Sequence, residues 1–149
     1  MREKIDAAVK DAMKAKDADR LSTLRMVRSA IQSKDIENRG TGKDAASDDE
    51  ILQVLAKMVK QREESATAFD AGKRPELAAK ERAEIAVIRD FQPKQMDDGE
   101  IEQAVQAAIA ETGAAGVKDM GKVIAVLRGK FVGQMDFGKA SGVVKRALG

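Results

Sequence analysis

The sequence predicts an all-α protein with about seven helices and no strand. Ala, Leu, Lys, Glu, Arg, Met and Gln, which all have high helix propensity, fill the periodic segments of this 149-residue chain. Apolar residues in those segments recur every three or four positions, which is the rhythm of an amphipathic helix. Only two prolines interrupt the chain, so few positions forbid a helix.

The first two helices are expected near residues 2–16 and 18–38. In the first, Ile5, Val9 and Met13 are four residues apart and therefore share one face. The second keeps the helical rhythm along its length, and its apolar face is expected to consist of Leu21, Leu24, Met26, Val27, Ala30 and Ile31.

A polar segment at 39–47 separates the second helix from a long third one. Ser47 and Glu50 form the S-x-x-E pattern of a capping box, in which each side chain accepts a hydrogen bond from the other residue's backbone N–H. Gly72 is expected to end this helix in the left-handed conformation, which glycine adopts without strain. Pro75 then suits the first position of a fourth helix, where an N–H group is not needed.

Pro93 marks the expected domain boundary, because proline disfavours a helical residue before it and a new helix start follows at once. Asp97 and Glu100 resemble a second capping box at that start. The sequence therefore predicts a helical amino-terminal domain at 1–93 and a three-helix tail domain at 94–149.

The tail contains the phrase G-x-x-x-x-G-K twice, at 116–122 and 133–139, which is the start of a phosphate-binding P-loop. A P-loop also needs Ser or Thr after the lysine to hold magnesium, and a strand that leads into the glycine turn. Here Val123 and Ala140 follow the lysines, and helical segments precede both glycines. The sequence therefore predicts no nucleotide site at either copy.

Each copy is better explained as the start of a helix. Asp119 and Asp136 stand at the same position of the repeated phrase, and both are expected to be N-caps whose carboxylates accept from backbone N–H groups of the first turn. Met120 and Phe137 follow as first-turn anchors into the core. The glycines of these two helices are expected to let neighbouring helices approach closely, namely Gly121, Gly129, Gly138 and Gly142.

Composition excludes several classes of site. The chain has no Cys and no His, which removes disulfides, thiol nucleophiles, the usual zinc ligands and a histidine proton shuttle. No apolar run approaches the roughly 20 residues of a membrane helix, and the amino terminus lacks the apolar segment of a secretory signal. We therefore expect a cytoplasmic protein with no catalytic residue, no metal, no cofactor and no membrane partner.

Several stretches of the sequence resemble the YqeY-like family. They are LRMVRSAIQSKDIE at 24–37, KQREESATAF at 60–69, KRPELAAKERAEIAVI at 73–88, Pro93, and then ETGAAGVKDMGKV and GQMDFGKASGVVKRAL in the tail. They occur in the family's order and spacing and span essentially the whole chain. One departure is the pair Phe91-Gln92 before the proline, where a Tyr-Leu pair is common, and this alters the linker contact.

The resemblance implies an all-helical protein whose carboxy-terminal half is similar to the tail domain of the B subunit of the glutamyl-tRNA(Gln)/aspartyl-tRNA(Asn) amidotransferase. In that enzyme the tail reaches towards the elbow of tRNA, while other domains activate the acyl group and release ammonia. Those chemical parts have no counterpart in this sequence. The resemblance therefore implies a non-catalytic, tRNA-binding accessory protein of the amidotransferase or aminoacyl-tRNA machinery.

The charges of the tail are segregated along the sequence. Residues 97–111 hold five acidic residues and no basic one, whereas 118–149 hold seven basic residues against Asp119 and Asp136. The whole chain is nearly balanced, with 27 basic and 25 acidic residues, so any attraction to nucleic acid must be local. The candidate RNA-binding residues are Lys118, Lys122, Arg128, Lys130, Lys139, Lys145 and Arg146.

Several alternatives stay open. The basic residues of the tail are either an RNA surface or a solvated exterior, and Arg25, Lys60 and Arg62 are either a ligand surface or, as we favour, an ion-pair network that fixes helix packing. The tail is alternatively a module that docks on an amidotransferase or another protein through an apolar groove. A third possibility is carbon–nitrogen ligase activity with glutamine as amide donor, which only the family association suggests.

Overall fold

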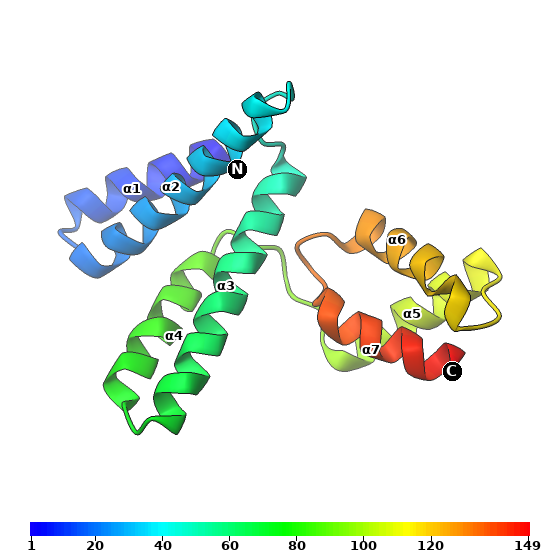
Figure 1. Cartoon of the computed structure of the whole chain (residues 1–149). Helices are drawn as coiled ribbons and strands as arrows, with labels where there is room; N and C mark the ends of the chain where they lie inside the picture. The colour runs from blue at the N-terminus through cyan, green and yellow to red at the C-terminus, as the bar shows by residue number, and fades with distance from the viewer. The chain divides into compact units, whose positions relative to one another are not determined.

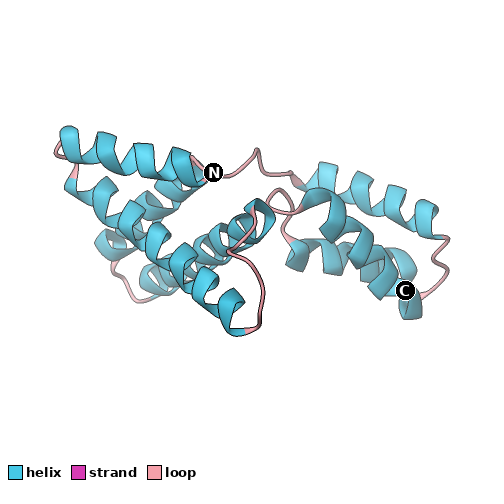
Figure 2. Ribbon diagram, turned by 90° about the horizontal axis from the view of Figure 1, so that it is seen from above, coloured by secondary structure: helices cyan, strands magenta, loops and turns pink.

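The computed structural model describes all residues 1–149, and every regular element is a helix. Seven α-helices and one short 3₁₀ helix follow one another along the chain (Figures 1 and 2). This confirms the all-α class predicted from the sequence. The chain divides into two compact units, Met1–Gln92 and Pro93–Gly149. None of the helices combines the length and apolar character that a membrane span requires.

Two helical hairpins make up the first unit. Helix α1 (Arg2–Lys14) packs beside α2 (Ala18–Gly40), and α3 (Asp48–Ala71) packs beside α4 (Pro75–Arg89) (Figure 1). Helix α2 also contacts both α3 and α4, so one core forms between the two hairpins.

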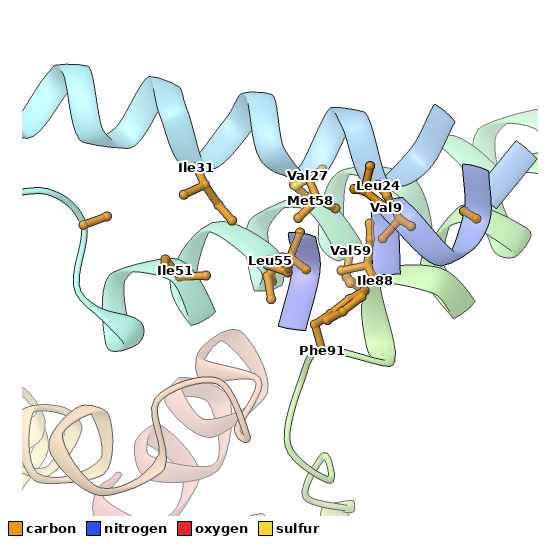
Figure 3. Packing of buried hydrophobic residues seen from close by; sticks show 13 residues of the cluster. Val9, Leu24, Val27, Ile31, Ile51, Leu55, Met58, Val59, Ile88 and Phe91 are labelled. Carbon is orange, nitrogen blue, oxygen red and sulfur yellow. The ribbon is translucent and has the colours of Figure 1, made fainter. Parts of the chain in front are cut away.

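The core of the first unit consists mainly of aliphatic side chains from all four helices. Leu24 and Val27 of α2 and Leu55 of α3 are completely buried, and Figure 3 shows their side chains directed into the layer between the helices. Phe91, immediately after α4, is buried at the edge of the same cluster. The spacing of three or four residues between apolar positions is what places these side chains on one face of each helix.

The second unit is a three-helix bundle. Helices α5 (Asp98–Thr112), α6 (Met120–Phe131) and α7 (Phe137–Leu148) pack against one another, and a 3₁₀ turn, η1 (Val117–Asp119), runs directly into α6. Helices α6 and α7 are antiparallel (Figure 1). The completely buried side chains of this unit's core include Val105, Val123, Leu127, Ala140 and Val144.

The segment that enters the second unit is tied to the turn between α6 and α7. The Met96 N–H donates to the Gln134 carbonyl at 2.8 Å, and the Gln95 side-chain amide donates to the Gly133 carbonyl at 2.7 Å. Gly133 has a φ of 77°, a conformation in which a side chain would be strained. The turn between α6 and α7 therefore favours glycine at position 133 of the repeated phrase.

Two capping boxes begin helices α3 and α5. Ser47 accepts a hydrogen bond from the Glu50 N–H at 3.2 Å, and Glu50 accepts one from the Ser47 N–H at 3.3 Å. Asp97 and Glu100 form the same reciprocal pair, at 2.8 and 3.2 Å. The local pattern of a cap residue followed three positions later by Glu is thus sufficient to place both helix starts.

The prediction for Gly72 is wrong. Its φ is −82°, and the next residue, Lys73, takes the left-handed conformation with a φ of 58°. The Arg74 N–H donates to the Phe69 carbonyl at 2.8 Å. This hydrogen bond closes the helix end by the Schellman pattern, in which the residue before the donor, here Lys73, is left-handed. The helix end is therefore of the expected type but lies one residue later.

A single carboxylate ties α2 to the start of α1 and to the loop before α3. Asp35 accepts two hydrogen bonds from the Arg2 guanidinium, at 2.9 and 2.7 Å, and a third from the Ala46 N–H at 2.8 Å. The Asp35 side chain is 14% exposed. The hydrogen bonds from Arg2 and then from Ala46 stabilise the charged form and lower the pKa of Asp35 from 3.8 to about 2.

This low pKa predicts that stability depends on Asp35 only above acid pH. Because the folded-state pKa lies below the unfolded value, the contribution is complete above about pH 4 and is lost as the pH falls towards 2. We expect Asp35→Asn to lower the free energy of unfolding by about 1–3 kcal/mol at neutral pH, and by much less at pH 2, in urea denaturation. Asp44→Asn, at an exposed carboxylate with no ion pair, is the control. An equal loss of unfolding free energy in Asp35→Asn at both pH values would contradict this account.

Candidate nucleic-acid interface

Neither copy of the glycine phrase has the context of a P-loop, because no strand leads into Gly116 or Gly133. The second copy begins a helix as predicted. The Asp136 carboxylate accepts from the backbone N–H groups of Gly138 at 2.9 Å and Lys139 at 3.2 Å. Asp136 is therefore the N-cap of α7.

Asp119 does not cap α6, so this part of the prediction is wrong. It directly precedes the helix, but its carboxylate accepts from the Ala115 N–H at 3.0 Å, four residues back. The reason is the 3₁₀ turn that ends at Asp119 and leaves its backbone in a turn conformation, with a φ of −92° and a ψ of 1°. Asp136 is extended, with a φ of −77° and a ψ of 103°, and an extended backbone is what lets a cap side chain reach the first turn.

The glycines of α6 and α7 do not serve close helix packing, contrary to the prediction. A Cβ atom on Gly121, Gly129 or Gly142 would meet no other atom within 4 Å. On Gly138 it would lie 3.2 Å from the Asp136 carboxylate, which is the cap of the same helix. Gly121, Gly129 and Gly142 therefore face open space, and the larger core side chains make the contacts between the helices.

The outer surface of α6 and α7 is limited to two kinds of residue. Every exposed residue within these helices is either small or positively charged. The small residues are Gly121, Ala125, Gly129, Gly138, Gly142 and Ala147. The charged residues are Lys122, Arg128, Lys130, Lys139, Lys145 and Arg146. Together with the exposed Lys118 of η1, these residues form what we term the basic face.

Three lysines of the basic face have carboxylate neighbours. The ammonium group of Lys130 lies 2.7 Å from Glu111, and that of Lys139 lies 3.4 Å from Asp98. Both carboxylates belong to α5, and a looser contact of 3.9 Å joins Lys122 to η1. The charge segregation along the sequence is thus partly cancelled in space. Exposed ion pairs of this kind contribute at most about 1 kcal/mol, so the lysines can exchange partners readily.

The other four basic residues have no carboxylate partner, namely Lys118, Arg128, Lys145 and Arg146. The Arg128 guanidinium lies over the ring of Phe137 at 5.5 Å and joins the end of α6 to the start of α7. At the opposite end of the hairpin, Gly149 lies beside Val117, which brings Lys118 close to the end of α7. Unpaired positive charges therefore lie at both ends of the basic face.

The comparison with protein families decides which family the chain represents. It matches the family described as "Yqey-like protein" over residues 2–148. The chain belongs to the YqeY-like family. The match confirms the resemblance found in the sequence and covers nearly the whole chain.

Curated relatives of this YqeY-like protein carry the name "Altered inheritance of mitochondria protein 41, mitochondrial". The relative from Kluyveromyces lactis is 39% identical over 85 residues, which cover 56% of this chain and 44% of the relative. The relative from Saccharomyces cerevisiae is 35% identical over 83 residues, which cover 56% and 43%. The relative from Pyrenophora tritici-repentis is 28% identical over 134 residues, which cover 87% and 72%. The chain thus spans less than half the length of the two yeast relatives in the matched regions.

The polar residues of the YqeY-like runs in the first unit fall into two groups. Arg62 belongs to a packing network, because its Nε donates to Glu84 at 2.9 Å and its Nη1 donates to the Met58 carbonyl at 3.1 Å. The Arg62 and Glu84 side chains are only 14% and 16% exposed. Arg25 and Lys60, in contrast, are exposed and make no ion pair. No group of three carboxylates is placed to hold a metal ion.

The open space beside Gly142 gives a direct test of its role in this YqeY-like fold. Gly142 lies inside α7, so alanine should fit there without strain and should reduce the conformational freedom of the unfolded chain. We expect Gly142→Ala to raise the free energy of unfolding by about 0.5–1 kcal/mol in urea denaturation. The reverse substitution, Ala125→Gly inside α6, should lower it by a similar amount. A loss of stability in Gly142→Ala would show that the fold itself needs this glycine.

Proposed function

We propose that this YqeY-like chain is a non-catalytic accessory protein that binds tRNA through the basic face. The observation that carries the proposal is that the exposed residues of α6 and α7 are all small or positively charged. Lysine and arginine neutralise phosphates and release their counterions, which is the main source of affinity in sequence-independent binding to nucleic acid. The glycines place no side chain between these charges, so a sugar–phosphate backbone can approach the helix surface.

The available side chains favour recognition of the RNA backbone. None of the four phenylalanines is exposed, so there is no aromatic platform for unpaired bases. Lysine and arginine can instead contact phosphates and 2′-hydroxyls that a folded RNA presents at fixed spacing. The exposed ion pairs of Lys130 and Lys139 with α5 add little stability, so phosphates can replace those carboxylates at small cost.

Transfer RNA is the proposed ligand because the sequence of the second unit resembles the amidotransferase tail domain that reaches towards the tRNA elbow. We propose the amidotransferase or the wider aminoacyl-tRNA machinery as protein partner on the same ground. Docking through an apolar groove finds less support in the second unit. Val117 is its only large apolar side chain that is exposed, which is too little for an apolar docking patch.

Fluorescence anisotropy with labelled, unfractionated tRNA tests the proposal. We expect saturable binding of the full chain at low salt, and competition by unlabelled tRNA. Single-stranded DNA of the same length should compete much less well, because it lacks both the folded backbone and the 2′-hydroxyls. Absence of binding at low salt, or equal competition by the two nucleic acids, would contradict the proposal.

A further inference from the structure

A groove between α1 and α2 is another place where polar side chains gather, and some of them have no partner. Its volume of about 440 Å³ is within the range of small-molecule sites. Ile5 and Ile31, both buried, contribute apolar atoms to its lining. The exposed polar residues that α2 contributes to the groove are Arg25, Arg28, Ser29 and Gln32.

The charges around this groove do not balance. Three arginines and two aspartates line it. Arg2 holds Asp35 through two hydrogen bonds, and the Nε of Arg28 lies 3.3 Å from Asp6. Arg25 has no carboxylate neighbour, although it lines the groove and is exposed. Arg25 is therefore the one arginine of the groove that forms no ion pair.

The unpartnered groups share one face of α2. Arg25, Ser29 and Gln32 follow one another at spacings of four and three residues, so they stand in a row along the helix. A guanidinium presents paired N–H donors whose geometry matches the two oxygens of a carboxylate or phosphate group. The neighbouring hydroxyl and carboxamide can donate to the remaining oxygens.

We infer that this groove binds a small organic oxyanion, either a phosphomonoester or a carboxylate. Arg25 and Ser29 bind the charged group, Gln32 donates to it from the next turn, and the apolar body of the ligand lies along the groove between α1 and α2. The site is in the first unit and does not involve the basic face, so it does not depend on the proposal of tRNA binding.

An NMR titration of the ¹⁵N-labelled full chain tests the inference with three probes: phenyl phosphate, benzoate and inorganic phosphate. We expect saturable shifts at the backbone amides of Arg25, Ser29 and Gln32 with at least one of the two organic probes. The organic probe that binds more tightly identifies the oxyanion. Inorganic phosphate should bind more weakly than phenyl phosphate if the phosphomonoester is preferred, because it has no apolar body. Shifts confined to the basic face, or no saturable shift in α2, would overturn the inference.

Arg25→Gln removes the unpaired charge and should lower the affinity for the better probe at least tenfold. Arg74→Gln is the matched control, since Arg74 is exposed, makes no ion pair and does not line the groove. The Arg74→Gln variant should bind the better probe with the same affinity as the wild type. The dispersed amide spectrum of each variant reports whether it is folded. Unchanged affinity in a folded Arg25→Gln variant, or an equal loss in Arg74→Gln, would contradict the site.

Discussion

The double charge reversal Lys139→Glu/Arg146→Glu should weaken tRNA binding by at least about 100-fold at low salt. Both side chains are exposed and lie seven residues apart on α7, so they point in similar directions with Gly142 between them. The substitution replaces two attractions to phosphate by two repulsions. Anisotropy titration with labelled tRNA measures the loss, and circular dichroism checks that the helices remain.

The matched control is Lys57→Glu/Lys60→Glu, which changes the net charge of the chain by the same amount. These two lysines are exposed on α3 in the first unit and have no ion pair. We expect this control to weaken binding much less, because these two lysines are not part of the basic face. An equal loss in the two double variants would mean that net charge, and not the basic face, attracts the RNA.

Removal of Glu84 should produce a large loss of stability. We expect Glu84→Ala to lower the free energy of unfolding by about 2–4 kcal/mol in urea denaturation. The substitution leaves the Arg62 guanidinium, whose side chain is 14% exposed, without its counter-charge. The bond from Arg62 to the Met58 carbonyl remains, but a neutral acceptor compensates a part-buried charge only partly.

Glu63→Ala is the control for this prediction, because it also replaces a helical glutamate by alanine. The partner of Glu63 is Arg89, and the two side chains are 53% and 40% exposed. We expect this variant to lose less than about 1 kcal/mol. Similar losses in the two variants would show that the burial of the Arg62–Glu84 pair does not determine its contribution.

The helix starts of this chain could be predicted because their signals are local. The capping boxes at Ser47 and Asp97 and the cap at Asp136 need only residues within one turn of the helix. The same reasoning fails at Asp119, because a 3₁₀ turn before α6 changes the backbone conformation of the cap residue. At Gly72 the type of helix end is right and its position is shifted by one residue.

The electrostatic contacts could not be predicted in the same way, because their partners are distant in sequence. Arg2 binds Asp35 across 33 residues, and Lys130 reaches Glu111 across 19. The second contact shows why segregation of charge along a sequence overstates segregation in space. Helices that follow one another in a bundle pack side by side, so an acidic helix partly neutralises its basic neighbours.

The glycines were assigned to helix packing from the sequence, and the structure places them on the surface instead. A signal for the surface position was present, since Gly121, Gly129 and Gly142 each lie two positions from an apolar residue of the same helix, namely Val123, Leu127 and Val144. Residues two apart in a helix point in directions about 200° apart, so these glycines lie opposite the apolar stripe. The apolar stripe of each helix already accounted for the packing.

The salt dependence of tRNA binding tests the central claim most directly. If phosphates bind the basic face, the logarithm of the association constant should fall linearly with the logarithm of the salt concentration, with a slope of about −3 to −6. The slope of Lys139→Glu/Arg146→Glu should be shallower by about 2, because two phosphate contacts are missing. Wild-type binding with a slope near zero, or no binding at the lowest salt concentration, would contradict the account.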